Sequence, residues 1–229
     1  MTEESITIEN YILDVSPLAD EEAFNFYYEM MPQYRKEKID SLRRKSDKYL
    51  SVGAGIVLKR ICEDNGINIS EEIDVGKNGK PYIKSHPMLQ YNISHSGNCV
   101  FGSSGSMEVG CDIEIDDAAN LNVAKRFFSD RENAYLLSLP EHERDKAFFK
   151  LWTLKESFVK CVGSGFSLPL NKFSVYFEND EVSVEQSIFK DEFALITGRY
   201  EDKYTYSCCT RYSRSCSQPK FSDPIKVEI

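Results

Sequence analysis

Short runs of alternating apolar and polar residues predict strands in two separate parts of the chain. Residues 6–15 (ITIENYILDV) are rich in isoleucine and predict the first strand. Residues 91–94, 98–104 and 107–115 predict three more short strands, separated by glycine and serine. Strand-like segments return near the end of the chain, at residues 172–177, 182–186, 193–197 and 203–210. The two groups of strands are separated by a region with helical periodicity.

Helical patterns also follow the first strand. Asp20 is placed to cap a helix that runs to the break at residues 30–32 (MMP). Residues 33–64 carry a longer helical pattern, which ends at Asn65-Gly66, a common helix stop.

The region between the two strand groups predicts two helices. Ser129-Asp-Arg-Glu132 is a capping box that begins a helix of about ten residues, stopped by Pro140. A second helix runs from about residue 141 to 161 and ends at residues 163–165 (GSG).

This order of elements predicts an α+β protein with two lobes, each with helices packed on a small antiparallel sheet. The N-terminal lobe is expected at residues 1–106 and the C-terminal lobe at residues 107–229, with a loosely held polar tail from about residue 211. A cleft between two such lobes is a common place for a ligand.

Composition excludes several classes of function. The 229 residues include 28 Lys and Arg against 37 Asp and Glu, a net charge of −9 that disfavours nucleic-acid or anionic-membrane binding. No apolar stretch is long enough to span a bilayer, and the segment MTEESITIEN does not resemble a signal peptide. The seven cysteines include no C-x-x-C pair and are expected to be buried, reduced thiols of a cytoplasmic protein.

The strand at residues 107–115 carries the first candidate chemistry. Period-two alternation places Asp112 and Glu114 on one face. Two neighbouring carboxylates repel each other unless a cation lies between them, and oxygen ligands select a hard cation such as Mg²⁺. An edge strand with its polar face in water explains the same pattern equally well.

The helix at residues 147–160 carries the second candidate. Phe149, Trp152, Glu156 and Lys160 share one face at helical spacing, and Lys155 is expected at the edge of that face. An exposed ion pair between Glu156 and Lys160 is the simpler reading of this helix alone.

Two further segments suggest phosphate binding. Residues 92–97 (NISHSG) place Ser94 and His95 at the end of a strand, where a phosphate or ribose could bind, although a lone histidine is commonly a surface residue. Residues 35–48 hold seven basic and three acidic residues, a local charge of 7 − 3 = +4, which suits either a terminal phosphate or a solvated helix face.

Together these segments resemble a known family. GKP at residues 79–81, NISHSG at 92–97, VGCDIE at 109–114, KRFFS at 125–129 and LWTLKESFVKCVGSGFSLPL at 151–170 occur in the order and spacing of the Sfp-type 4′-phosphopantetheinyl transferases. The resemblance extends from about residue 35 to residue 177.

The resemblance implies a pseudo-twofold α+β enzyme that binds coenzyme A and Mg²⁺ between its lobes. Such an enzyme moves the 4′-phosphopantetheine arm of coenzyme A onto a serine of an apo acyl or peptidyl carrier protein and releases adenosine 3′,5′-bisphosphate. The implied metal-site residues are Asp112, Glu114 and Glu156, and the implied catalytic residues are Glu156 and Lys155. The implied coenzyme A-binding residues are Arg35, Lys38, Lys80, Pro81, Ser94, His95, Lys155 and Lys160.

Several of these assignments leave alternatives open. Lys36 competes with Arg35 and Lys38 for the adenosine 3′-phosphate. Where the family often has an arginine, this chain has Leu50 or Ser51, and Lys48 is the candidate replacement. Glu156 either takes the serine proton, directly or through a water, or serves only as a metal ligand.

The resemblance also implies a monomeric, cytoplasmic enzyme of secondary metabolism. Carrier docking is expected to be mostly apolar and near Phe127-Phe128, unless these two residues belong to the core. The competing functions are a metal-dependent phosphodiesterase and a catalytically silent coenzyme A-binding protein.

Overall fold

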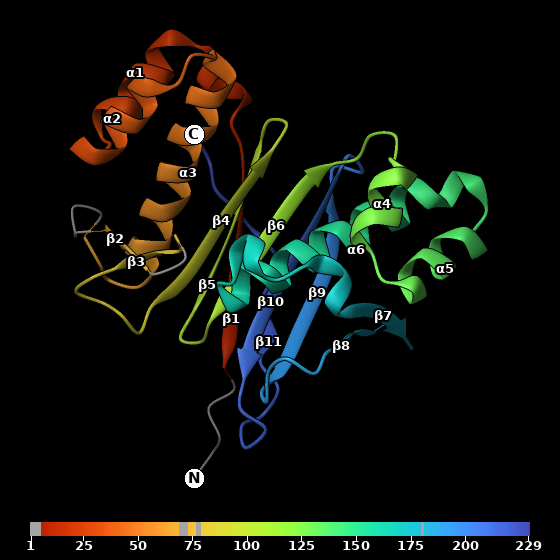
Figure 1. The fold of residues 1–229 in the computed structure, drawn as a ribbon. Helices are drawn as coiled ribbons and strands as arrows, with labels where there is room; N and C mark the ends of the chain where they lie inside the picture. The colour runs from red at the N-terminus through yellow and green to blue at the C-terminus, as the bar shows by residue number, and fades with distance from the viewer. Residues whose placement is uncertain (1–5, 69–72, 77–78, 180) are drawn as a thin grey trace.

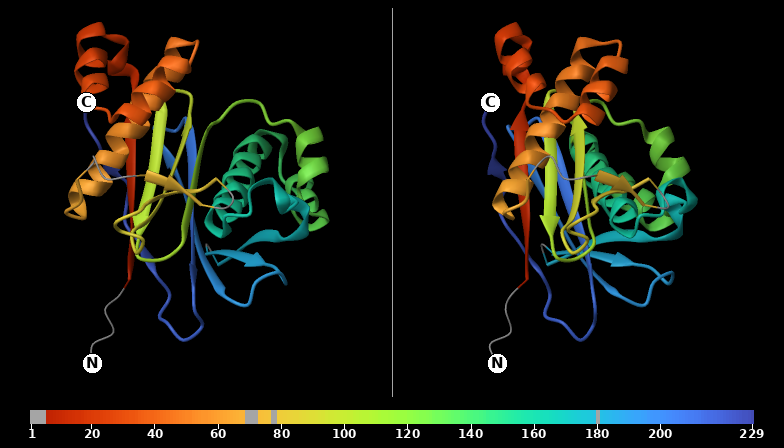
Figure 2. Two further views of the ribbon diagram at one scale, coloured as in Figure 1. Left: turned by 60° about the vertical axis from the view of Figure 1, so that its left-hand side comes forward. Right: turned by 90° about the vertical axis from the view of Figure 1, so that its left-hand side faces the viewer.

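The structure is a computed structural model that describes residues 6–68, 73–76, 79–179 and 181–229, apart from the side chain of Phe166. Two five-stranded sheets lie face to face, and a long helix packs against the outer face of each sheet (Figure 1). The turned views in Figure 2 show these layers from the side. The α+β architecture predicted from the sequence is confirmed.

The first sheet has the strand order β11-β1-β5-β4, and β12 also pairs with β1. Its central strands are apolar on both faces because each face meets a different layer. In β1, Tyr11 and Leu13 pack in the core with α3, whereas Ile8 and Ile12 pack in the core between the two sheets. The elements of this half are β1 (Thr7–Asp14), η1 (Ser16–Ala19), α1 (Glu21–Glu29), α2 (Gln33–Ser41), α3 (Lys45–Asp64), β2 (Ile73–Val75), β3 (Pro81–Ile83), β4 (Gln90–Ser96) and β5 (Cys99–Gly105).

The helical pattern predicted at residues 33–64 is two helices rather than one. Leu42 and Arg44 adopt extended backbone between α2 and α3. In α2, Ile39 is the one buried side chain among its described residues, so α2 lacks the apolar face that runs along α3.

The second sheet has the strand order β6-β10-β9-β8-β7. The predicted capping box at Ser129 is confirmed, and α6 ends at Gly163, whose φ of 62° is the left-handed conformation that glycine favours. The short helix α4, capped by Asn120, was not predicted. The elements of this half are β6 (Val109–Ile115), α4 (Leu121–Phe127), α5 (Asp130–Ser138), α6 (Glu141–Val162), η2 (Gly165–Ser167), η3 (Leu170–Lys172), β7 (Ser174–Glu178), β8 (Glu181–Glu185), β9 (Glu192–Tyr200), β10 (Tyr204–Tyr212), β11 (Lys220–Phe221) and β12 (Ile225–Lys226).

The C-terminal segment is not the loosely held tail expected from the sequence. Strands β11 and β12 pair in parallel with β1 at the edge of the first sheet, and the side chain of Asn10 donates to the backbone carbonyl of Ser222 (2.9 Å). Ile225, Val227 and Ile229 alternate with polar residues and pack against the core that contains α3. This segment therefore attaches to the first half of the chain, whereas a lobe boundary near residue 106 stays a prediction.

Among the described residues, no helix combines the length and the apolar character that a membrane span requires.

Candidate active site

The edge strands β4 and β6 meet along a seam between the two sheets. Side chains, rather than a backbone ladder, bridge this seam. Ser94 Oγ donates to Asp112 Oδ1 (2.8 Å), and Ser96 Oγ donates to Glu114 Oε2 (2.8 Å). The side chain of Asn92 accepts a hydrogen bond from a backbone N–H of β6 (2.9 Å). The predicted carboxylates of β6 therefore lie at the junction of the two halves, not on a solvated edge.

Asp112 is the most deeply buried of these carboxylates, with 3% of its surface exposed. Its Oδ1 accepts a hydrogen bond from Lys160 Nζ of α6 (2.6 Å), whereas its Oδ2 is buried and has no partner within the described residues. Burial works to lower the pKa of Lys160, but the ion pair with Asp112 outweighs it and raises that pKa. Lys160 therefore stays charged in the site.

Two more carboxylates lie near Asp112. Burial, and then the negative charge of Asp112, raise the pKa of Glu114 and of Glu156. The charge of Asp112 contributes to the pKa shift of both glutamates, so the three predicted acids interact electrostatically. A cation at their centre would relieve this repulsion.

Gly110 explains how β6 comes so close to α6. A Cβ atom at this position would lie 2.1 Å from the backbone nitrogen of Cys161 and 2.2 Å from the carbonyl oxygen of Ser157. Only a residue without a side chain allows this approach, which brings Asp112 within reach of Lys160. The sequence shows Gly110 beside Asp112, but periodicity alone does not show this contact.

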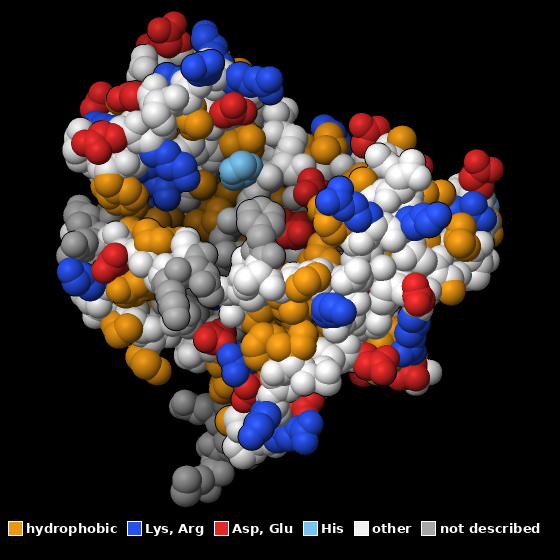
Figure 3. Space-filling view, viewed as in Figure 1, with side chains coloured by type: hydrophobic (Ala, Val, Ile, Leu, Met, Phe, Trp, Pro, Cys, Tyr) orange, Lys and Arg blue, Asp and Glu red, His pale blue; other side chains and the backbone are white. Residues whose placement is uncertain are grey.

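A pocket of about 650 Å³ opens beside the carboxylates. Its polar lining includes Lys80, Asn92, Glu156 and Lys160, and Lys80 Nζ donates to the carbonyl of Val109 (2.8 Å). Figure 3 shows acidic side chains in the hollow between the two halves of the molecule, with basic side chains beside them. The apolar lining is formed by Pro81, Phe127, Trp152, Val159, Leu168, Pro169 and Leu170. This lining suits a ligand with one charged part and one apolar part.

Lys155 does not lie at the edge of this site, contrary to the sequence prediction. Its side chain is fully buried and forms an ion pair with Glu132 of α5 (2.6 Å). Burial lowers the pKa of Lys155 to about 8, and the charge of Glu132 opposes that shift. Successive residues of a helix point about 100° apart, so a neighbour of Glu156 can face the core. Lys155 therefore cannot contact a ligand in the pocket in this arrangement.

The predicted phosphate-binding residues lie on the first half of the chain. Arg35 Nη1 donates to the carbonyl of Ser51 (3.2 Å), and both Arg35 Nε and Ser51 Oγ are buried without a partner among the described residues. The surrounding protein lowers the pKa of the exposed His95, and the positive charges of Lys160 and Lys38 lower it further.

The rival residues have other contacts. Lys36 forms an ion pair with Glu29 (2.6 Å), and Leu50 packs against the apolar core of the first half. Sequence reasoning missed Ser96, which a period-two continuation from Ser94 would have found. Phe128 belongs to the core, with 2% of its surface exposed, whereas its neighbour Phe127 lines the pocket.

The donor set suits a hard divalent cation. No group of three His, Cys, Asp or Glu side chains within residues 6–68, 73–76, 79–179 and 181–229 already has the arrangement of a metal site. The buried, unpartnered Oδ2 of Asp112 nevertheless needs a positive partner, and the neighbouring glutamates supply further oxygen ligands. The residues present therefore fit Mg²⁺ in their chemistry.

Comparisons with known proteins identify the family that this chain is similar to. A family model described as the 4′-phosphopantetheinyl transferase superfamily matches residues 108–209. The 4′-phosphopantetheinyl transferase ffp of Bacillus subtilis is 37% identical over 196 residues, which are 84% of this chain and 85% of that protein. The 4′-phosphopantetheinyl transferase Sfp of Bacillus subtilis (strain 168) is 35% identical over 221 residues, 92% of each chain. A solved holo-(acyl-carrier-protein) synthase from Bacillus anthracis str. Ames is 15% identical, with a TM-score of 0.40 over 47% of this chain and 96% of that chain. The two transferases match most of this chain, not only its second half.

Proposed function

This chain belongs to the 4′-phosphopantetheinyl transferases, and we propose that it transfers the 4′-phosphopantetheine arm of coenzyme A to a serine hydroxyl of an apo carrier protein. The leaving product is adenosine 3′,5′-bisphosphate. The observation that carries this proposal is the group of Asp112, Glu114, Glu156 and Lys160, of which Glu156 and Lys160 line a pocket formed by both halves of the chain.

The two ends of coenzyme A suit two different parts of the site. Arg35, Lys38, Ser51 and His95 would hold the adenosine 3′-phosphate, since Arg35 Nε and Ser51 Oγ are buried polar atoms without partners in the described structure. Lys80 and Pro81 would contact the adenosine, with Ser94 beside the diphosphate. The apolar wall near Phe127 would cover the pantetheine arm.

A bound Mg²⁺ would be held by Asp112, Glu114 and Glu156, and it would neutralise charge on the diphosphate oxygens. Lys160, which already pairs with Asp112, is the nearby side-chain cation that offsets charge on the departing bisphosphate. Lys155 takes no part in this contact, because its side chain is fully buried and paired with Glu132.

In the reaction, the serine oxygen of the carrier attacks the phosphorus that bears the pantetheine arm. The bond from that phosphorus to the bridging diphosphate oxygen breaks, and the bisphosphate leaves with the bond electrons. Glu156 accepts the serine proton. The enzyme is proposed to act as a cytoplasmic monomer.

The proposal is tested by intact-protein mass spectrometry of apo acyl and peptidyl carrier proteins incubated with this protein, coenzyme A and Mg²⁺. We expect each substrate carrier to gain one phosphopantetheine, and chelation to abolish the gain. Glu156→Gln should lower the rate by about 10²–10⁴-fold, because it removes the general base. Glu143→Gln, an exposed change on the same helix, is the matched control.

Two other outcomes would contradict the transferase. Free phosphopantetheine formed without any carrier would indicate a metal-dependent phosphodiesterase. Coenzyme A binding without transfer to any carrier in a broad panel would indicate a silent binding protein.

A further inference from the structure

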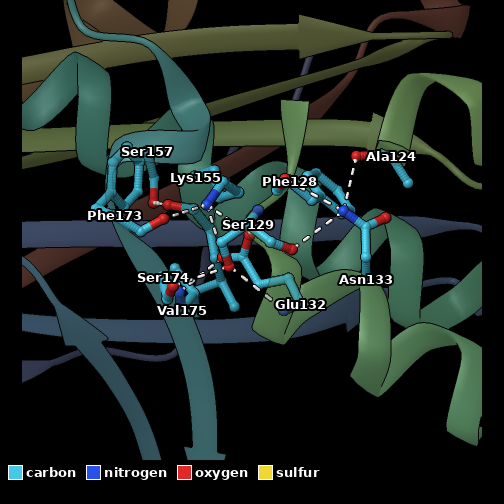
Figure 4. A network of polar contacts seen from close by, with 11 residues as sticks. Ala124, Phe128, Ser129, Glu132, Asn133, Lys155, Ser157, Phe173, Ser174 and Val175 are labelled. Atoms are coloured by element: carbon cyan, nitrogen blue, oxygen red, sulfur yellow. Dashed lines mark hydrogen bonds and ion pairs between the residues drawn. The ribbon is translucent and has the colours of Figure 1, made fainter. Parts of the chain in front are cut away.

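A buried ion pair joins Lys155 of α6 to Glu132 of α5, on a face of α6 that does not line the pocket (Figure 4). Lys155 Nζ donates to both carboxylate oxygens of Glu132, at 2.6 and 2.8 Å, and to the carbonyl oxygen of Phe173 at 2.9 Å. Neither charged side chain has any exposed surface. The active-site chemistry proposed above uses neither of them.

The pair connects α6, which lines the pocket, to α5 and β7, which do not line it. Glu132 also accepts hydrogen bonds from the backbone N–H of Ser129, at the start of α5, and of Val175, in β7, both at 2.7 Å. Lys155 thereby joins α6 to the start of α5 and to the start of β7. In Figure 4 these groups converge on the single lysine nitrogen and the single carboxylate.

A contribution to folding stability does not by itself explain why a buried ion pair is present here. Moving two charges out of water costs about as much as their attraction returns, and apolar replacements of buried ion pairs are often neutral. The hydrogen bonds around a buried pair are directional, however, and they define one arrangement of the elements that carry them. A geometric role is therefore the better explanation.

The pocket depends on that geometry in two ways. Glu156 makes no side-chain hydrogen bond within the described residues, so the rotation of α6 sets where its carboxylate points. Residues 163–172, which line the pocket, contain only two short 3₁₀ turns, and they end at Phe173, the residue that Lys155 holds.

We propose that the Lys155–Glu132 ion pair is a positioning device for the active site. It fixes the rotation of α6, and with it the direction of Glu156, and it anchors the end of the pocket-lining segment. This inference rests on the proposed function, and both residues act through others without touching the substrate.

The test is the double variant Lys155→Met with Glu132→Gln, which leaves no buried charge unpaired. The glutamine keeps one acceptor oxygen for the backbone N–H of Ser129 or Val175, and the methionine removes the donor to the carbonyl of Phe173. Leu136→Ala is the matched control, because it weakens the packing of α5 without touching the pair. The kinetic readouts are kcat and the KM for coenzyme A.

We expect the double variant to fold and to lose about 10- to 100-fold in kcat, the effect of a small misplacement of catalytic groups. Its KM for coenzyme A should stay near the wild-type value, because the 3′-phosphate contacts lie on the first half of the chain. A kcat equal to that of Leu136→Ala would overturn the proposal. If the double variant does not fold, Lys155→Arg, which keeps the buried charge of Glu132 paired but changes the geometry of the contacts, is measured in its place, and an unchanged kcat there has the same meaning.

A second readout does not depend on transferase activity. Trp152 is the single tryptophan of the chain, lies on α6 and lines the pocket. Acrylamide should quench its fluorescence more readily in the double variant than in wild type or Leu136→Ala. Unchanged quenching would contradict the positioning role of the ion pair, whether or not the wild-type protein has transferase activity. A wild-type protein without transferase activity would refute only the proposed function.

Discussion

Arg35 and Ser51 place two unpartnered polar atoms side by side in the first half of the chain. Arg35→Met should raise the KM for coenzyme A by roughly 10-fold or more, the loss expected for a charge-assisted hydrogen bond to phosphate. It should leave the KM for dephospho-coenzyme A unchanged, since that substrate lacks the 3′-phosphate. Steady-state kinetics with both substrates measures the difference.

Arg43→Met, an exposed change between α2 and α3, is the control for general loss of positive charge. An equal rise in KM for both substrates with Arg35→Met would place Arg35 away from the 3′-phosphate.

The cysteines differ sharply in exposure. All seven are free thiols, and six of them are buried as predicted, whereas Cys216 is exposed, contrary to the prediction. Burial raises the pKa of Cys62 and of Cys99 to about 11, so these thiols remain protonated and unreactive below that pH. At pH 8 Ellman's reagent should therefore label one thiol of the native chain quickly and all seven after denaturation.

The same shifts predict a pH dependence of stability. Unfolded thiols ionise near pH 9, the ordinary value, whereas the buried thiols hold their protons to about pH 11. The native state is therefore favoured fully below pH 9 and loses free energy of unfolding as the pH rises from 9 to 11. A melting temperature that rises across this interval would contradict the assignment.

At the scale of elements, the contact between β6 and α6 is the closest in the site. Gly110→Ala would drive a Cβ atom into the backbone of α6, which cannot move aside as a side chain can. We expect a loss of about 3 kcal/mol or more in the free energy of unfolding, together with loss of transfer activity, because Asp112 would shift relative to Lys160.

Gly105→Ala is the matched control on the neighbouring strand. Its Cβ atom would meet the end of the Ile8 side chain at 2.6 Å, and the nearest backbone atom, the carbonyl oxygen of Thr7, would lie at an ordinary contact distance of 3.5 Å. Denaturant unfolding and activity assays of both variants separate the two cases. Similar losses in both would show that the sheet, rather than the β6–α6 contact, is sensitive.

Local patterns explain how far the sequence could predict these elements. Period-two alternation identified the face of β6 that carries Asp112 and Glu114, and helical spacing placed Glu156 and Lys160 on one face of α6. The same helical spacing led to a wrong position for Lys155, because spacing gives the direction of a side chain around the helix axis but not the residue that it contacts. That partner, Glu132, lies 23 residues earlier in the chain. Its capping role was visible in the sequence, but its contact with Lys155 depends on how α5 packs on α6.

The C-terminal segment also shows that local patterns do not predict contacts between distant parts of the chain. Two prolines and many polar residues between residues 211 and 229 suggested a loose tail. The alternation of Ile225, Val227 and Ile229 was the available signal, but the strand they join, β1, is more than 200 residues away. Pairing over such a distance cannot be read from a local window.

At the scale of the whole molecule, this segment joins the two halves from the side opposite the seam between β4 and β6. Val227→Asp would bury an unpaired charge in the core around α3. We expect the melting temperature to fall by roughly 10 °C, the shift that a few kcal/mol produces in a chain of this size. Glu228→Gln, its exposed neighbour, should leave the melting temperature unchanged.

Calorimetry and the fluorescence of Trp152 together test how the halves are coupled. Because Trp152 lies in the second half, coincident transitions in the wild-type protein would indicate that both halves unfold together. If Val227→Asp leaves that melting temperature unchanged, the C-terminal segment contributes little to holding the molecule together.

The parallel pairing of β11 and β12 with β1 has a further consequence during protein synthesis. The other strands of the first sheet are complete once residue 105 is made, but β12 ends at residue 226. At translation rates of roughly 5–20 residues per second, the edge of β1 waits about 6 to 24 s for its neighbours. An unpaired strand edge is prone to aggregation throughout that time. Slower codons between these points lengthen the wait, so they should lower the yield of folded protein without changing one amino acid.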